Sequence, residues 1–414
     1  MLVANRGGLP QGDTEDPVLI ARPRGGVPAV VDTPADLERA ASRLRSGSAP
    51  VALDVERALG FRYGSDPYLV QIRREDVGSF LIDSHALPDL SPLNDGVGST
   101  WLLHDCSQDL PNLRAVGLRC PELFDTEIAA RLVGMRRFGL ASVAESVLGL
   151  ALVKDHQAAD WSVRPLPKDW LRYAALDVEL LTELYRRLST RLHDLGRWEW
   201  ATQEFAHALS VPDPRPDPER WRSVKGAGAL KTPRQLAYLR ELWSAREGIA
   251  RDLDLSPGRL VRNSALIRAA SRPPANRRAL LSIGEFRSPV ARQYTDQWMR
   301  ALTRARTMDE ARLPRRHRRP APGELPDART LKRVDEEAAA RLGQIRLAVA
   351  GVASALDLDP EVVLAPRVQR YIAWAPLGRA RAGADEVGER MSEYGARPWQ
   401  IGLTAAPVRA ALGL

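Results

Sequence analysis

The chain contains little cysteine and no long apolar run. Cys106 and Cys120 are the only cysteines among 414 residues, and no CxxC pair occurs. This scarcity argues against a disulfide framework and a structural zinc site. No apolar run approaches the roughly 18 residues that span a membrane. The opening stretch, Met1-Leu-Val-Ala-Asn-Arg-Gly-Gly, lacks the charged-then-apolar layout of a secretory signal. We therefore expect a cytoplasmic protein that does not bind membranes.

Acidic residues are sparse in one region of the chain. Residues 231–306 contain 16 Lys and Arg but only 6 Asp and Glu, which gives this region a net charge of +10. The whole chain has a net charge of +8, so the remaining residues together carry −2. A basic excess confined to one region is typical of a module that contacts phosphates. The alternative is a solvated helical surface in an arginine-rich proteome.

Proline-rich stretches divide the chain, which is long enough for two or three domains. Alternate prolines at 212–218 predict an extended spacer, and residues 312–322 form a second, basic proline-rich stretch. These breaks predict a loosely ordered leader over 1–30 and an α/β domain over 31–210. A linker over 211–230 then leads to a helical domain over 231–308, and a second linker over 309–326 leads to another helical domain over 327–414.

The first domain is predicted to contain a mixed sheet flanked by helices. Residues 51–57 alternate apolar and polar side chains, which predicts a strand. Further strands are expected at 68–73, 79–83 and 101–104, with the first three forming an antiparallel meander. Helices, or a strand followed by helices, are expected over 124–132 and 140–148, and one long helix over 168–195. The resulting order indicates an α/β layer architecture.

Four carboxylates and one tyrosine occur where this topology gathers side chains. Asp54 and Glu56 project from one face of the first strand, since they are two residues apart. Asp109 begins the helix after the fourth strand, and Asp177 follows Tyr173 by one helical turn. Oxygen ligands alone favour Mg²⁺ or Mn²⁺, and two such ions clamp a phosphodiester during hydrolysis. The alternative for the strand pair is a polar face at a sheet edge.

These residues carry a resemblance to a known family. Asp54-Val-Glu56, His104-Asp-Cys-Ser-Gln-Asp109 and Tyr173-Ala-Ala-Leu-Asp177 resemble the three motifs of the DEDD 3′→5′ exonucleases, tyrosine subclass, with spacing similar to the ribonuclease D family. The resemblance covers about residues 30–210, and it implies a ribonuclease H-like fold. The basic region resembles the helicase-and-RNase-D C-terminal (HRDC) domain, and the last domain would be a second, divergent HRDC-like bundle.

The resemblance implies roles for particular residues. Asp54, Glu56 and Asp177 would hold the ion that activates water, with Asp54 bridging to a second ion and Asp109 acting through its outer shell. Tyr173 would orient or deprotonate the attacking water. Lys154, His156 and Arg57 are candidate substrate contacts, although Lys154 and His156 could equally lie on a surface turn. Many relatives have an aromatic residue where this chain has Arg57.

We therefore expect a monomeric 3′→5′ exoribonuclease that uses Mg²⁺ or Mn²⁺ and releases nucleoside 5′-monophosphates from structured RNA, such as tRNA precursors. One alternative is a DNA 3′→5′ exonuclease in repair, because the choice of sugar depends on contacts to the 2′-hydroxyl. Another is a non-catalytic nucleic-acid-binding protein. His104 is expected to pack or hydrogen-bond, and Cys106 lacks the partners of a thiolate nucleophile.

Overall fold

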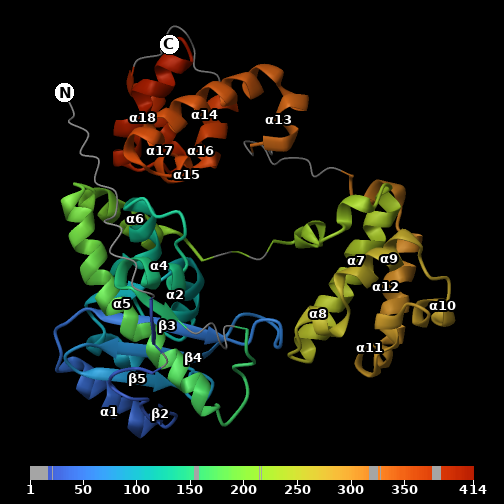
Figure 1. Ribbon diagram of the computed structural model, residues 1–414. Coiled ribbons are helices and arrows are strands. Elements are labelled where there is room, and N and C mark those ends of the chain that lie inside the picture. Colours follow the sequence, from blue (N-terminus) through green and yellow to red (C-terminus); the bar gives the residue numbers. More distant parts are fainter. Residues whose placement is uncertain are drawn as a thin grey trace.

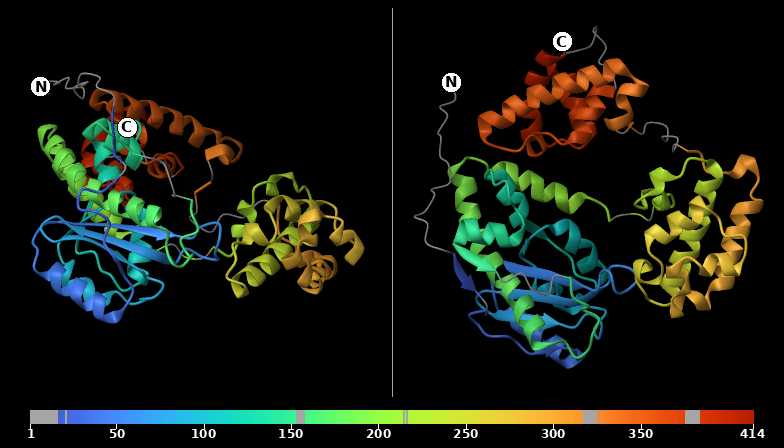
Figure 2. Two further views of the ribbon diagram at one scale, coloured as in Figure 1. Left: turned by 60° about the horizontal axis from the view of Figure 1, so that its bottom comes forward. Right: turned by 45° about the vertical axis from the view of Figure 1, so that its right-hand side comes forward.

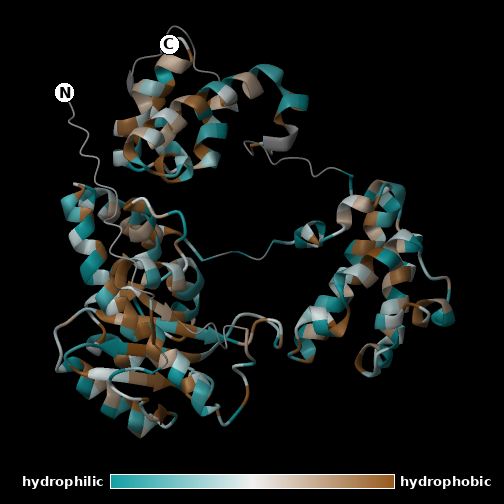
Figure 3. Ribbon diagram, in the orientation of Figure 1, coloured by the Kyte–Doolittle hydropathy of each residue, from teal (hydrophilic) through white to brown (hydrophobic). Residues whose placement is uncertain are grey.

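An α/β domain is followed by two all-α domains (Figure 1). The computed structural model describes residues 17–20, 22–152, 158–213, 215, 217–316, 325–326, 328–374 and 384–414. Figure 3 shows apolar residues concentrated in the central strands of the α/β domain. Among the described helices, none has both the length and the apolar character that crossing a bilayer requires.

The central sheet has six strands and is mixed, as predicted. The three middle strands form the antiparallel meander, while the outer strands pair in parallel. From one edge to the other, the strands are β2 (Val30–Val31), β5 (Gly78–Ile82), β4 (Pro67–Arg74), β3 (Val51–Arg57), β6 (Thr100–Leu103) and β7 (Glu122–Asp125).

Helices cover both faces of this sheet. Helix α1 (Pro34–Arg45) lies on one side and α5 (Lys168–Asp194) on the other (Figures 1 and 2). The hydroxyl oxygen of Thr33 accepts a hydrogen bond from the Asp36 amide, so α1 begins with a side-chain N-cap followed by a first-turn proline. The remaining helices of the domain are α2 (Cys106–Ala115), α3 (Thr126–Leu132), α4 (Leu140–Leu148), α6 (Trp198–Ser210) and the 3₁₀ turn η1 (Ser91–Gly96).

Part of the expected leader belongs to the folded domain. Strand β1 (Val18–Ile20) pairs in parallel with β8 (Leu150–Leu152), and β2 pairs with β5. The Arg24 amide also donates to the Glu179 carboxylate on α5. These partners are distant in sequence, so the local glycine- and proline-rich composition gave no indication of them.

The basic domain begins earlier than the sequence suggested. Trp221 lies in the predicted linker, yet it is fully buried in one core with Phe286 and Trp298. The long helix α7 starts at the capping box of Thr232 and Gln235. The elements of this domain are η2 (Arg220–Ser223), η3 (Ala227–Ala229), α7 (Pro233–Asp252), α8 (Pro257–Leu260), α9 (Asn263–Ser271), α10 (Arg277–Leu281), η4 (Gly284–Arg287), α11 (Pro289–Gln293), α12 (Thr295–Thr307) and η5 (Glu310–Arg312).

The last domain docks on the α/β domain through α6. The rings of Trp200 and Trp399 stack with centroids 4.8 Å apart. The Glu204 carboxylate accepts hydrogen bonds of 2.7 Å from both Arg397 Nε and Trp399 Nε1. Trp399 therefore packs into the core of the first domain. The helices of the last domain are α13 (Ala328–Val334), α14 (Glu336–Leu356), α15 (Pro360–Val363), α16 (Pro366–Trp374), α17 (Ala384–Glu393) and α18 (Pro398–Ala411).

Candidate active site

Three of the predicted carboxylates converge on one face of the sheet. Asp54 and Glu56 project from β3, and Asp177 approaches them from α5, which packs against β3, β4 and β5. One carboxylate oxygen from each of the three lies within 4.8 Å of the others. Asp109 on α2 is buried beside this group but is not one of the three. Its charge raises the pKa of Glu56, and the charge of Asp54 raises the pKa of Asp109.

Burial and mutual repulsion disfavour the charged forms of these carboxylates. Burial is the largest cause of a raised pKa at Asp54, and it lifts the pKa of Glu56, Asp109 and Asp177 well above the ordinary range. The negative charge of Asp54 is the second cause at each of those three groups. A cation between them would remove both penalties.

The donor set fits a hard divalent cation. Asp54, Glu56 and Asp177 offer only carboxylate oxygens, the ligands that Mg²⁺ and Mn²⁺ prefer. These three side chains would hold the ion, and the buried Asp109 would add negative charge beside it.

Tyr173 lies beside the carboxylates and stays protonated. Burial is the main cause of its raised pKa, and the charge of Asp177 adds to it. Its hydroxyl forms a hydrogen bond with the Asp177 carboxylate, which lowers the pKa of Asp177. A protonated phenol can orient a carboxylate or a water molecule, so this geometry favours orientation over proton abstraction by Tyr173.

The predicted substrate contacts are only partly described. Arg57 Nη1 lies 3.3 Å from the Gln108 side-chain oxygen on α2. Its positive charge lowers the pKa of Asp54 and Asp109, so it partly offsets the acidic cluster. Lys154 and His156 lie outside the described residues. Substrate contact by these three residues stays a prediction.

His104 and Cys106 have structural surroundings, as the sequence indicated. His104 Nδ1 lies 2.8 Å from the Thr126 hydroxyl oxygen, which confirms a hydrogen-bonding residue. Cys106 is buried, and burial strongly raises the pKa of its thiol. A thiolate nucleophile at Cys106 is therefore disfavoured.

Gln71 is a buried neighbour of the site that the sequence analysis did not single out. It pairs with Asp54 across β3 and β4, so both side chains lie on the same face. Gln71 is fully buried, and neither its amide nitrogen nor its oxygen has a hydrogen-bond partner among the described residues. Aligning the two predicted strands of the meander could have found it.

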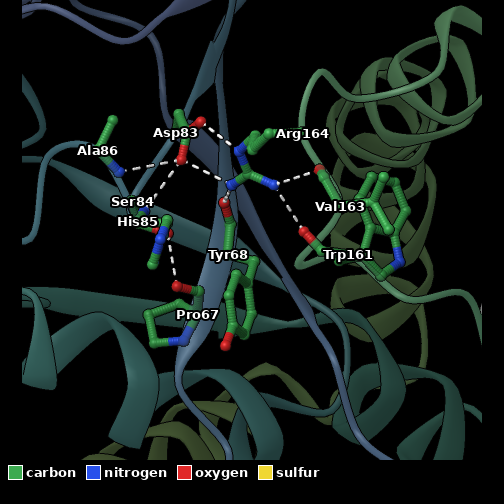
Figure 4. A network of polar contacts seen from close by, with 9 residues as sticks. All are labelled: Pro67, Tyr68, Asp83, Ser84, His85, Ala86, Trp161, Val163 and Arg164. Carbon is green, nitrogen blue, oxygen red and sulfur yellow. Dashed lines mark hydrogen bonds and ion pairs between the residues drawn. The ribbon is translucent and has the colours of Figure 1, made fainter. Parts of the chain in front are cut away.

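The segment that leads into α5 is anchored by Arg164 (Figure 4). Arg164 Nε and Nη2 donate to the two Asp83 carboxylate oxygens at 2.5 and 2.6 Å. Its guanidinium also donates to the carbonyl oxygens of Tyr68, Trp161 and Val163, each at 2.8 Å. These bonds join β4 and the end of β5 to the start of α5, and so they help to place Asp177.

Three family models match successive parts of the chain. Residues 28–193 match a model described as 3′-5′ exonuclease, and residues 235–302 match the HRDC domain. Residues 324–412 match a model described as 3′ to 5′ exonuclease C-terminal domain. The exonuclease and HRDC domains that the sequence predicted are thus confirmed.

Curated relatives decide the family. Ribonuclease D of Pseudomonas paraeruginosa is 33% identical over 285 residues, which cover 66% of this chain and 74% of that protein. The chain belongs to the ribonuclease D family. Ribonuclease D of a Shewanella species is 36% identical over 233 residues, covering 54% of this chain and 59% of the relative.

Solved structures share the fold of this ribonuclease D family member. A protein from Bifidobacterium adolescentis has a TM-score of 0.86 and 36% identity, and the match covers 96% of this chain and 100% of that chain. Escherichia coli RNase D, described as an exoribonuclease involved in structured RNA processing, has a TM-score of 0.63 and 25% identity. That match covers 89% of this chain and 99% of the E. coli chain.

Proposed function

We propose that this protein is a metal-dependent 3′→5′ exoribonuclease that releases nucleoside 5′-monophosphates. The observation that carries the proposal is the convergence of Asp54, Glu56 and Asp177 on one buried face. The family supports RNA as the substrate, since E. coli RNase D is described as acting in structured RNA processing. Tyr173 and Asp109 complete the set that the resemblance implied.

The residues around the site would divide the work of phosphodiester hydrolysis. Divalent ions, when bound, supply activation of water and neutralisation of the developing charge. Asp54, Glu56 and Asp177 would hold these ions, and Asp109 would act through the outer coordination shell. The Tyr173 hydroxyl would donate its hydrogen bond to the Asp177 carboxylate and accept one from the attacking water, which would orient both groups.

A nuclease assay on matched substrates tests this function. We expect purified protein with Mn²⁺ or Mg²⁺ to shorten a 5′-labelled, 3′-extended tRNA one nucleotide at a time, and EDTA to stop the reaction. A DNA strand of the same sequence should be cut more slowly. Faster cleavage of DNA would favour the repair exonuclease, and binding without any metal-dependent cleavage would favour the non-catalytic alternative.

Replacing Tyr173 with Phe tests its orienting role. We expect the single-turnover rate to fall by about 10- to 100-fold, because one hydrogen bond in the transition state is lost. The Mn²⁺ dissociation constant should change little, since Tyr173 is not one of the three grouped carboxylates. An unchanged rate would dismiss the role, and weakened Mn²⁺ binding would show that Tyr173 mainly supports the carboxylates.

The HRDC domain offers a basic depression for RNA phosphates. It lies between α12 and the start of α10 and is lined by Arg277, Arg300 and Arg304. All three arginines are exposed, but Arg304 pairs with Glu241 and Arg277 with Asp296, whereas Arg300 has no ion-pair partner among the described residues. Arg300 is therefore the side chain best placed to meet a phosphate.

Replacing Arg300 with Ala should weaken RNA binding in a salt-dependent way. Loss of one phosphate contact is expected to reduce the slope of log K against log salt concentration by about 0.7 for single-stranded RNA. Fluorescence anisotropy at several salt concentrations measures this slope. Arg187→Ala, on an exposed part of α5, is the matched control and should leave it unchanged. Equal slopes for Arg300→Ala and wild type would place the phosphate contacts elsewhere.

The proposal extends to the natural substrate, the oligomeric state and the location of the protein. tRNA precursors are the proposed natural substrates, and the active form is proposed to be a monomer in the cytoplasm. Mass photometry and sequencing of RNA 3′ ends in a deletion strain would test the oligomeric state and the substrates. The HRDC-like character of the last domain stays a prediction, and so do the domain boundaries of the sequence analysis other than the leader and the start of the basic domain, which the fold revises.

A further inference from the structure

The loop between β3 and β4, residues 58–66, contacts the HRDC domain. It reaches the turn between α7 and α8, as two views show (Figures 1 and 2). The Ser256 amide donates to the Phe61 carbonyl oxygen at 2.9 Å, and the Tyr63 amide donates to Asp254 Oδ1 at 3.2 Å. Arg259 Nε donates to the Gly60 carbonyl oxygen at 2.7 Å. Three main-chain groups of the loop thus bond to the HRDC domain, one of them to a main-chain amide and two to side chains.

Aromatic side chains of the loop add to this contact. The Arg259 guanidinium lies 4.0 Å from the centre of the Phe61 ring. Arg251 Nη2 donates to the Tyr63 hydroxyl oxygen at 3.1 Å, and Tyr63 packs against the HRDC core. Cation–π contacts of this kind are individually weak at exposed sites. The loop therefore holds the HRDC domain through several weak contacts together.

The same loop is tied to the catalytic segments. It starts directly after Glu56 and Arg57, and Arg57 contacts Gln108, the neighbour of Asp109. Arg62 Nε donates to the Ser162 hydroxyl oxygen at 2.8 Å, in the segment that leads into α5. Arg62 Nη1 also lies 3.5 Å from Asp254 on the HRDC side. The loop thus touches the basic domain and the segment before α5, and it continues directly from the end of β3, where Arg57 contacts α2.

The length of the loop limits how far the basic domain can stand from the metal site. Phe61 follows Glu56 by five residues, and a fully extended chain spans at most about 3.6 Å per residue. The Phe61 backbone therefore lies within about 18 Å of Glu56. The HRDC turn at Ser256, bonded to Phe61, is held at a similar distance.

We propose that residues 58–66 form a clasp that fixes the HRDC domain beside the metal site and so determines specificity for long RNA. RNA bound by the basic domain would then present its 3′ end to the carboxylates at a high effective concentration. A trinucleotide, which is too short to engage both domains, would not benefit. This inference rests on the proposed exoribonuclease function.

A double substitution on the HRDC side tests the clasp in the full chain. Asp254→Gly with Arg259→Ala removes the side-chain bonds to the Gly60 carbonyl and the Tyr63 amide and the contacts to the Phe61 ring and Arg62. The main-chain bond from Ser256 to Phe61 keeps both its groups and reports on the loop. Glycine suits position 254, whose φ of 46° is left-handed. We expect kcat/KM for a 3′-extended tRNA to fall roughly tenfold, mostly through KM. The kcat/KM for a labelled trinucleotide should stay within about twofold, because the clasp acts only on RNA that engages both domains.

Arg272→Ala with Asp309→Ala is the matched control. It removes the same two charges at the opposite end of the domain, where Ser271 and Met308 contact the start of α7. This control should leave both substrates unaffected. If the clasp variant lost kcat/KM equally on both substrates, the active site would be damaged. If it lost kcat/KM on neither substrate, the loop would only pack against the HRDC domain. Each of these results overturns the proposal.

Hydrogen exchange gives a readout that does not depend on activity. The Ser256 and Tyr63 amides should exchange slowly in the wild-type chain and faster in the clasp variant, while α9 and α12 remain protected. Rapid exchange of the Ser256 amide in the wild-type chain would contradict the clasp. A wild-type chain that fails to cut even the trinucleotide would contradict the proposed function instead.

Discussion

Asp177→Asn protein is expected to lose cleavage of RNA by about 1,000-fold or more, because the divalent ions that activate water lose one of three grouped carboxylates. RNA affinity, which depends on the basic domain, should stay within about twofold. Asp54→Asn should behave in the same way. Gel-based single-turnover assays and anisotropy measure the two quantities separately.

The same substitution should not destabilise the metal-free protein. Burial and the charge of Asp54 raise the pKa of Asp177 well above its ordinary range, so an ionised Asp177 costs folding free energy at neutral pH. Neutral Asn removes that cost, and we expect Tm without metal to stay equal or to rise. Mn²⁺ at 100 times its Kd should stabilise the wild type by about 2.7 kcal/mol and the variant by less.

Asp169→Asn is the control for Asp177→Asn. Asp169 lies in the first turn of the same helix but is exposed, and its ion-pair partner among the described residues is Arg172. It should keep wild-type cleavage and the wild-type response to Mn²⁺. Full cleavage by Asp177→Asn, or an equal loss in Asp169→Asn, would rule out the proposed metal site.

Arg164→Ala is expected to lower the free energy of unfolding by about 3 kcal/mol at pH 7. The substitution leaves the buried Asp83 carboxylate without its paired guanidinium and frees three carbonyl oxygens. The estimate stands at the low end for a buried pair because the Arg164 side chain is 27% exposed. Urea unfolding followed by tryptophan fluorescence measures the change. Because Arg164 anchors the start of α5, cleavage should fall as well.

The pH dependence of this loss follows from the pKa of Asp83. Burial alone would raise that pKa, but hydrogen bonds from Arg164 and from the backbone of Ala86 and His85 outweigh it and hold the pKa below its ordinary value. The stabilisation is therefore present above about pH 4 and is lost as pH falls through the lowered pKa. The difference between wild type and Arg164→Ala should shrink in that acidic range.

Arg186→Ala provides the comparison for an exposed ion pair. Arg186 contacts Glu75 and Glu183 at the surface, with 51% of its side chain exposed. Exposed pairs contribute about 0–1 kcal/mol. A loss from Arg164→Ala no larger than that from Arg186→Ala would contradict the anchoring role.

Local sequence patterns predicted the parts of the fold that depend on nearby residues. The alternation at 51–57 placed Asp54 and Glu56 on one face of a strand. The sheet topology then brought Asp177 to the same face. The strand face follows from a periodicity over a few residues, whereas the position of Asp177 follows from the order of strands and helices, which indicated the layered sheet.

Features that depend on distant partners could not be predicted in this way. Strand β1 pairs with β8 about 130 residues later. Trp221 sits in a proline-rich stretch but fills the HRDC core, and the loop at 58–66 gains its role only from the turn at Ser256. Tertiary packing decides the strand pairing, the burial of Trp221 and the contact of the loop, and neither the composition nor the periodicity of the sequence indicates such packing.

The docking of the last domain has a practical consequence for protein production. A fragment ending in the first linker would lose Trp399 and leave the Trp200 ring uncovered, with Glu204 deprived of two donors. Such a fragment would be prone to aggregate during expression. Surface-charge variants of the intact polypeptide are therefore the better tools for separating what each part of the molecule contributes.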